Sequence, residues 1–188
     1  MKALYSQKPD SFEKIGKSEL FYRWNIKEVS LYNPLTDRYT MQWECDQFKF
    51  IDIPEDDFLT MTLPEIGLQE AKQYMENKII EYDMSDNVNS FYFNGNPCWL
   101  DKNTRVGLMN STNIEKALGR ETTELILGNL DITLPVDSVI QMLYTIEIYA
   151  KDCYNVTAKH KITVENMSIV EQILEYDYKF GYPEKPNL

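Results

Sequence analysis

Residues 90–106 read Ser-Phe-Tyr-Phe-Asn-Gly-Asn-Pro-Cys-Trp-Leu-Asp-Lys-Asn-Thr-Arg-Val, which contains the signals for a β-hairpin followed directly by a helix. Asn94 and Gly95 stand between two aromatic-rich apolar runs, and a type I′ turn needs two residues that tolerate positive φ. Asp101 stands where a helix N-cap belongs, because its carboxylate accepts hydrogen bonds from the free N–H groups of a first turn. We therefore expect a hairpin and a helix over residues 102–118 to form one rigid corner.

Upstream of this corner the hydrophobic period is two. Apolar and polar residues alternate over residues 20–26 and 39–45, which predicts two half-buried strands. A third strand over residues 48–53 would complete a small antiparallel meander, whose aromatic face needs cover from the C-terminal part of the chain or from a partner. Residues 54–64 are turn-rich and acidic, and we place a domain boundary there.

Beyond this break the hydrophobic period becomes that of a helix. Residues 68–82 carry apolar side chains at spacings of three and four. A second hairpin is expected from strands over residues 123–127 and 130–134. The change of period predicts an α+β fold. It has an N-terminal small antiparallel β domain over residues 1–65, followed over residues 66–188 by a helical domain with a long helix and two β-hairpins.

The long helix is expected after Pro135, where the chain has its longest regular pattern. A period of 3.5 residues is the geometry of left-handed helix packing. Two members of this seam, Thr157 and His160, are polar, which indicates either the end of an intramolecular bundle or an interface with a partner. The seam consists of Val139, Leu143, Ile146, Ala150, Cys153, Thr157, His160, Val164 and Met167.

Composition excludes several classes of protein. Hydrophobic residues make up 43% of the 188 residues, so the chain is not of a disordered class. The formal charge of −11 disfavours binding to nucleic acid or to an anionic membrane surface. The N-terminus lacks the apolar core of a signal peptide, and no run has the length of a membrane span. We expect synthesis in a cytoplasm.

Residues that carry chemistry are few and scattered. His160 is the only histidine, so any Ser-His-Asp, Cys-His or histidine-rich metal site would have to include it, and a packing role is favoured instead. The acidic run at residues 52–57 lacks the spacing of a calcium loop. Cys45, Cys98 and Cys153 are far apart and are expected to be buried free thiols. The expectation is no catalytic residue, no metal and no cofactor.

The corner at residues 89–111 is similar to an uncharacterised domain family that recurs in phage and prophage tail-module proteins, especially those of anaerobic gut bacteria. Ile114-Glu-Lys-Ala117, Leu134-Pro135 and residues 150–154 extend the resemblance along the chain. Upstream, residues 21–29 resemble a small β-segment that often precedes this domain. The family has no chemistry attached to it. The resemblance implies a virion location, near tail fibres and baseplates.

Two non-enzymatic functions follow as hypotheses. The first is a structural or adaptor subunit of a phage virion, in a tail fibre or baseplate, which forms a homo-oligomer and docks to another phage virion protein. The alternative is an assembly factor (chaperone) for a tail fibre that is absent from the mature particle; a glycan-acting hydrolase is disfavoured. The structural or interface candidates are Trp24, Trp43, Asn94, Gly95, Trp99, Asp101, Arg105, Ile146, Cys153, His160 and Val164.

Overall fold

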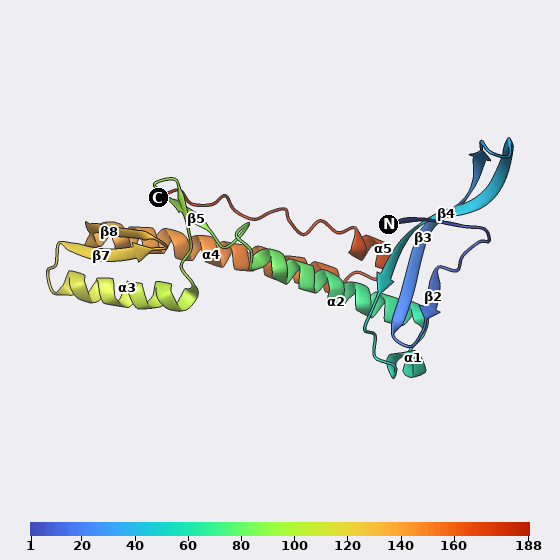
Figure 1. The fold of residues 1–188 in the computed structure, drawn as a ribbon. Helices are drawn as coiled ribbons and strands as arrows, with labels where there is room; N and C mark the ends of the chain where they lie inside the picture. Colours follow the sequence, from blue (N-terminus) through green and yellow to red (C-terminus); the bar gives the residue numbers. More distant parts are fainter. The chain divides into compact units, whose positions relative to one another are not determined.

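The computed structural model describes residues 1–188 and separates into two compact units (Figure 1). Unit 1 comprises Met1–Glu76 and Val164–Tyr176, and unit 2 comprises Asn77–Thr163 and Asp177–Leu188. Antiparallel strands and long helices are both present, so the α+β class is confirmed. The expected domain boundary after residue 65 lies inside a helix of unit 1, and the division into domains over residues 1–65 and 66–188 stays a prediction.

Unit 1 is built on a four-stranded antiparallel sheet, and this corrects the expected three-stranded meander. The strands β1 and β2 come from the first fifteen residues, where no strand was expected. The expected second strand and the start of the expected third strand form one strand, β4, which ends at Phe50, so residues 51–53 are not part of a strand. Asp46 and Gln47 are polar and separate the two expected segments in the sequence. The strand nevertheless continues through them, because both residues pair with β3 and with the N-terminal chain. In the order β1-β4-β3-β2 the strands are Lys2–Tyr5, Arg38–Phe50, Glu19–Asn33 and Phe12–Ile15.

Helices of the same unit adjoin this sheet. They are α1 (Asp57–Thr60), the first part of α2 (Leu63–Asp83) and α5 (Val170–Leu174). The rings of Phe48 on β4 and Tyr74 on α2 meet edge to face, with centroids 4.8 Å apart. The chain's own helices therefore supply cover for the sheet. The buried apolar residues of unit 1 are Leu20, Tyr22, Cys45, Phe50, Ile53, Ile66, Ala71, Met75, Val164, Val170 and Ile173.

Helix α2 begins earlier than residue 68, and the signal for this start is a capping box. The Glu65 carboxylate accepts hydrogen bonds of 2.8 Å from both the backbone N–H and the hydroxyl of Thr62. These bonds satisfy a free donor at the helix start and hold the pKa of Glu65 below its usual range. Helix α2 ends at Asp83, one residue after the helical pattern that the sequence shows over residues 68–82.

Unit 2 contains both expected hairpins and both expected helices. The first hairpin pairs β5 (Phe91–Phe93) with β6 (Asn96–Cys98), and the second pairs β7 (Thr122–Leu127) with β8 (Leu130–Pro135). Helix α3 covers Lys102–Ala117 and α4 covers Val136–Glu165. Their shared core consists of Phe91, Phe93, Cys98, Leu100, Leu125, Leu127, Val139, Met142, Leu143 and Ile146.

The turn and the cap at the corner are those expected from the sequence. Asn94 and Gly95 have φ values of 48° and 78°, the left-handed conformation that a type I′ turn requires. The Asp101 carboxylate accepts hydrogen bonds from the backbone N–H groups of Asn103 (2.9 Å) and Thr104 (3.0 Å). Hairpin β5-β6 and helix α3 are thus joined by a rigid, capped connection.

We expect Gly95→Val to destabilise unit 2 by about 1–3 kcal/mol, because a β-branched residue is strained at positive φ. Chemical denaturation followed by circular dichroism measures this loss. Gly107→Ala is the matched control, because Gly107 lies within α3 with open space around its missing Cβ. If Gly95→Val were as stable as the parent, residue 95 would not need the positive φ of a type I′ turn.

Replacing Asp101 by Ala is expected to lower the denaturation midpoint at neutral pH. Hydrogen bonds from the Thr104 side chain and backbone hold the pKa of Asp101 below its usual range. A lowered folded-state pKa gives stability that is present above the unfolded-state pKa and lost as pH falls through the folded-state value. The difference in denaturation midpoint between Asp101→Ala and the parent should therefore disappear at acidic pH. Asp101→Asn keeps a hydrogen-bond acceptor, so at neutral pH its midpoint should fall less than that of Asp101→Ala.

Most of the seam is buried, and Val139, Leu143, Ile146, Cys153 and Val164 are part of the chain's own interior. Ala150 is half-buried, as is Met167, which lies past the end of α4. The polar members of the seam are buried as well: Thr157 and His160 contact the C-terminal segment 177–188 and the end of α2. Of the two interpretations of this seam, the intramolecular one describes unit 2. Ile146, Cys153, His160 and Val164 accordingly lie in the interior of the protein.

The C-terminal segment 177–188 ends beside the first hairpin. The backbone N–H of Leu188 donates to the carbonyl of Tyr92 (2.7 Å), and the N–H of Tyr92 donates to the carbonyl of Pro186 (2.8 Å). Tyr92 and Asn187 thereby form a parallel bridge. The last residues thus occupy an edge of β5 that would otherwise be open.

Candidate functional site

A cluster of buried polar side chains in unit 2 holds the C-terminal segment in place. The Thr157 hydroxyl donates to Asp83 (2.6 Å) and lies 2.9 Å from the Tyr182 hydroxyl. His160 Nε2 lies 3.0 Å from the carbonyl oxygen of Phe180, and because a carbonyl only accepts, Nε2 carries the proton. The Nε2–H of His160 is therefore used in a hydrogen bond that holds the backbone of the C-terminal segment. Through this atom His160 does not activate a nucleophile.

Cys153 lies in the same part of the interior, beside Tyr149. Burial raises the pKa of the Cys153 thiol, and hydrogen bonding with Tyr149 opposes this only in part. Burial likewise raises the pKa of Cys45 and of Cys98. A higher pKa leaves less thiolate at neutral pH, so these thiols are poor nucleophiles in the folded protein.

We expect all three free cysteines to resist reaction with thiol reagents in the native state. Ellman's reagent at neutral pH should release no prompt colour from the folded protein and three equivalents after denaturation in urea. Rapid reaction of one native thiol would show a reactive, accessible cysteine and contradict the burial of that side chain.

Arg105 connects α3 to α4. Its Nε donates to Glu147 (2.8 Å) and a terminal nitrogen donates to the Leu100 carbonyl (2.6 Å). The guanidinium also lies 5.3 Å from the centre of the Trp99 ring. The structure therefore separates the roles of the two candidates: Asp101 caps α3, and Arg105 braces the packing of α3 on α4.

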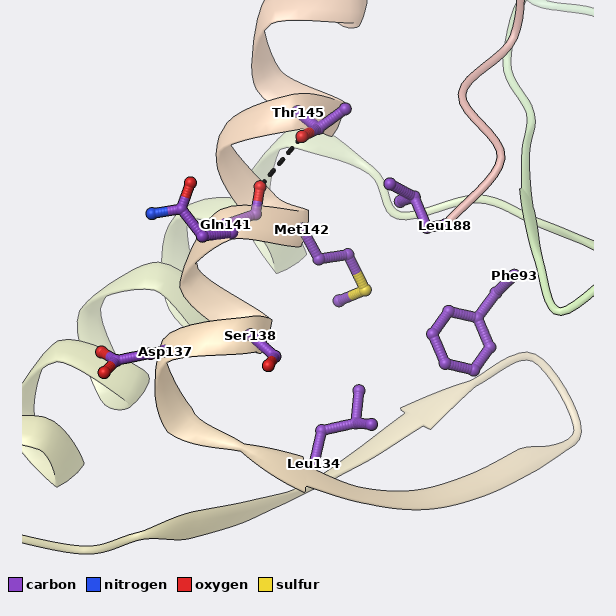
Figure 2. Close-up of a pocket in the computed structure, with 8 residues that line it drawn as sticks. All are labelled: Phe93, Leu134, Asp137, Ser138, Gln141, Met142, Thr145 and Leu188. Atoms are coloured by element: carbon purple, nitrogen blue, oxygen red, sulfur yellow. Dashed lines mark hydrogen bonds between the residues drawn. The ribbon is translucent and has the colours of Figure 1, made fainter.

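An apolar hollow in unit 2 opens beside the start of α4. Figure 2 shows Phe93, Leu134, Met142 and Leu188 directed toward a common space. The volume of this space is about 490 Å³. Polar side chains of α4 line its rim, and one of them, Asp137, is paired with Lys116 (2.7 Å). The hollow has the size and lining for an apolar side chain or a small apolar ligand.

The two longest strands of unit 1 continue as a two-stranded ribbon past the ends of their neighbours. We call residues 27–44, from the β3–β4 bulge to the hairpin tip and back, the β-ribbon. The last pairs that β1 and β2 make are at Trp43 and at Tyr22, so strands β3 and β4 extend alone beyond them. Figure 1 shows these ends projecting past the rest of the sheet.

One face of the β-ribbon is aromatic and exposed. Tyr32 and Tyr39 are cross-strand partners with ring centroids 5.2 Å apart, and Tyr39 is 71% exposed. Met41 follows on the same face, and Leu35 at the tip is 94% exposed. Apolar surface of this kind, on a ribbon with open backbone edges, is typical of a site where another chain binds.

Two of the tryptophan candidates, Trp24 and Trp43, contact other side chains of unit 1. Trp24 stacks on Tyr22, with ring centroids 5.2 Å apart, and its indole nitrogen donates to Glu175 (3.3 Å). Trp43 lies at the base of the β-ribbon, where the Lys8 ammonium group approaches its ring to 5.4 Å. Both indoles are half-buried in unit 1.

Protein-family models, curated proteins and solved structures all give no match to this chain. The resemblance to phage tail-module proteins therefore stays a sequence-based expectation. No helix in the structure combines the length and apolar character needed to cross a membrane. No group of three or more His, Cys, Asp or Glu side chains is arranged to hold a metal ion.

Sequence reasoning missed the β-ribbon and the apolar hollow for different reasons. The alternation over residues 20–26 and 39–45 marked β3 and β4, and continued alternation through Val29 and Leu31 was a signal for their full length. The hollow is assembled from β5, β8, α4 and the last residue, so no local pattern indicates it.

Proposed function

We propose that this protein is a non-enzymatic structural or adaptor subunit that works by associating with itself and with a second protein. The observation that carries the proposal is the exposed aromatic face of the β-ribbon. An isolated two-stranded ribbon is marginally stable in water, and its apolar side chains and backbone edges gain free energy when another chain covers them. The resemblance of residues 89–111 supplies the proposed setting, a phage virion with the tail fibre or baseplate as the place of assembly.

The positions of the remaining chemistry-bearing residues support the same proposal. His160, Cys153 and Arg105 each contribute to packing or to holding a segment in place. The seam of α4, by contrast, no longer argues for self-association, because the chain itself buries it. The case for association therefore rests on the β-ribbon and not on α4.

The test combines two measurements: the oligomeric state of the purified protein and the protein composition of the virion. Light scattering at micromolar concentration should show a species larger than 22.2 kDa. Mass spectrometry of virions purified from producing cells should detect the chain in the particle.

Two outcomes would replace the proposal. A self-associating chain that is absent from the purified virions would favour the assembly-factor function. Hydrolysis of a surface polysaccharide that is lost on replacing one carboxylate, with the fold retained, would favour an enzyme.

A further inference from the structure

The open edge of β3 in the β-ribbon has unused backbone hydrogen-bonding groups, and the strand register identifies them. Met1 and Gln47 exchange two backbone bonds, of 3.1 Å and 2.8 Å, so Gln47 faces β1. In an antiparallel ladder the backbone groups of alternate residues point to opposite edges. Of the remaining β4 residues, those that face β3 are Glu44, Gln42, Thr40 and Arg38, which pair with Lys27, Val29, Leu31 and Asn33.

The intervening β3 residues therefore direct their N–H and C=O groups away from β4. These residues are Glu28, Ser30 and Tyr32, and β2 does not cover them because it pairs with β3 only as far as Tyr22. The corresponding open edge of β4, before β1 begins, is shorter and contains only Tyr39 and Met41. The β3 edge is thus the longer template for an added strand.

We propose that the occupant of this edge is β3 of a second copy of the same chain, added antiparallel about a two-fold axis at Ser30. This proposal rests on the self-association proposed above and names its surface. The two copies would form one four-stranded sheet with the aromatic faces of both β-ribbons on the same side. A closed two-fold pairing of this kind uses the same residues on both partners.

Side-chain pairing distinguishes this register from its neighbours. Centred on Ser30, it places Val29 opposite Leu31 in both halves and Glu28 opposite Tyr32, with no like charges facing each other. A two-fold register centred on Glu28 would place two carboxylates directly opposite, and one centred on Val29 would place Lys27 opposite Leu31. Matched apolar pairs stabilise a sheet, and facing like charges destabilise it.

Charge also favours a second copy at this segment. The chain carries a formal charge of −11, so two copies repel each other over most of their surfaces. Residues 26–33 contain one lysine and one glutamate and have no net charge. Two acidic copies can therefore meet at this edge with little repulsion.

Cysteine trapping and proline blocking test the pairing in the full-length chain. Ser30→Cys lies on the axis and should form a disulfide-linked dimer under mild oxidation, whereas Thr40→Cys, exposed on β4 of the same ribbon, should not. The native thiols are buried and give little background. Ser30→Pro removes a backbone N–H that does not bond to β4 but would bond to the second copy. This substitution should raise the dimer dissociation constant by about tenfold or more. Met41→Pro removes the equivalent outward N–H from β4 and should leave the dimer intact.

The outcomes separate this surface from self-association in general. A parent chain that dimerises, while Ser30→Cys is trapped no better than Thr40→Cys and Ser30→Pro still dimerises, would overturn the β3 edge and retain the proposed function. A parent chain that stays monomeric up to high micromolar concentration would overturn both. Should Ser30→Pro fail to fold, the comparison of the two cysteine variants decides the question by itself.

Discussion

Ile146→Glu is expected to unfold unit 2, with a loss of more than about 4 kcal/mol in the free energy of unfolding. Ile146 is 0% exposed and lies in the core shared by α4 and both hairpins. A carboxyl group there has to be buried without a partner or expose the core to water. Because natural domains are stable by only about 5–15 kcal/mol, such a loss removes nearly all the stability of a domain near the lower limit and a large part of it in a more stable one.

Ile148→Glu is the matched control for this change. Ile148 is two residues further along the same helix but is 56% exposed, so the same substitution should change stability by no more than about 0.5 kcal/mol. Urea denaturation followed by circular dichroism compares the two variants. Equal midpoints would show that the seam is not the buried side of α4.

Phe91→Ala is expected to cost about 3–5 kcal/mol, the usual range for removing a buried aromatic side chain. Phe91 is 0% exposed and packs with Leu127 and Leu143 in the core of unit 2. The loss combines the removed apolar contact with a cavity that the surrounding hairpins and helix cannot fill completely.

Tyr92→Ala provides the comparison, because Tyr92 is the next residue of β5 and its side chain is 38% exposed. Its backbone bonds to the C-terminal segment remain available after the substitution. The denaturation midpoint should therefore fall much less for Tyr92→Ala than for Phe91→Ala. The opposite order would mean that β5 is turned over, with Tyr92 inward.

Residues close in sequence determined much of unit 2. Asn94 and Gly95 predict the first turn, because few residue types tolerate the positive φ that the turn needs. Asp101 predicts the start of α3, because a cap depends only on the next three residues. The period of the α4 seam identified the buried side of that helix before any partner was known.

Tertiary structure alone decided what those elements contact. The seam period was equally consistent with an interface between copies, and only the positions of Asp83, Phe180 and Tyr182 show that the chain itself surrounds Thr157 and His160. The sheet order of unit 1 was also beyond local reasoning, because pairing of β1 with β4 joins residues 38 to 44 positions apart. Local patterns record which side of an element avoids water, whereas the identity of the partner depends on long-range packing that no short stretch of sequence encodes.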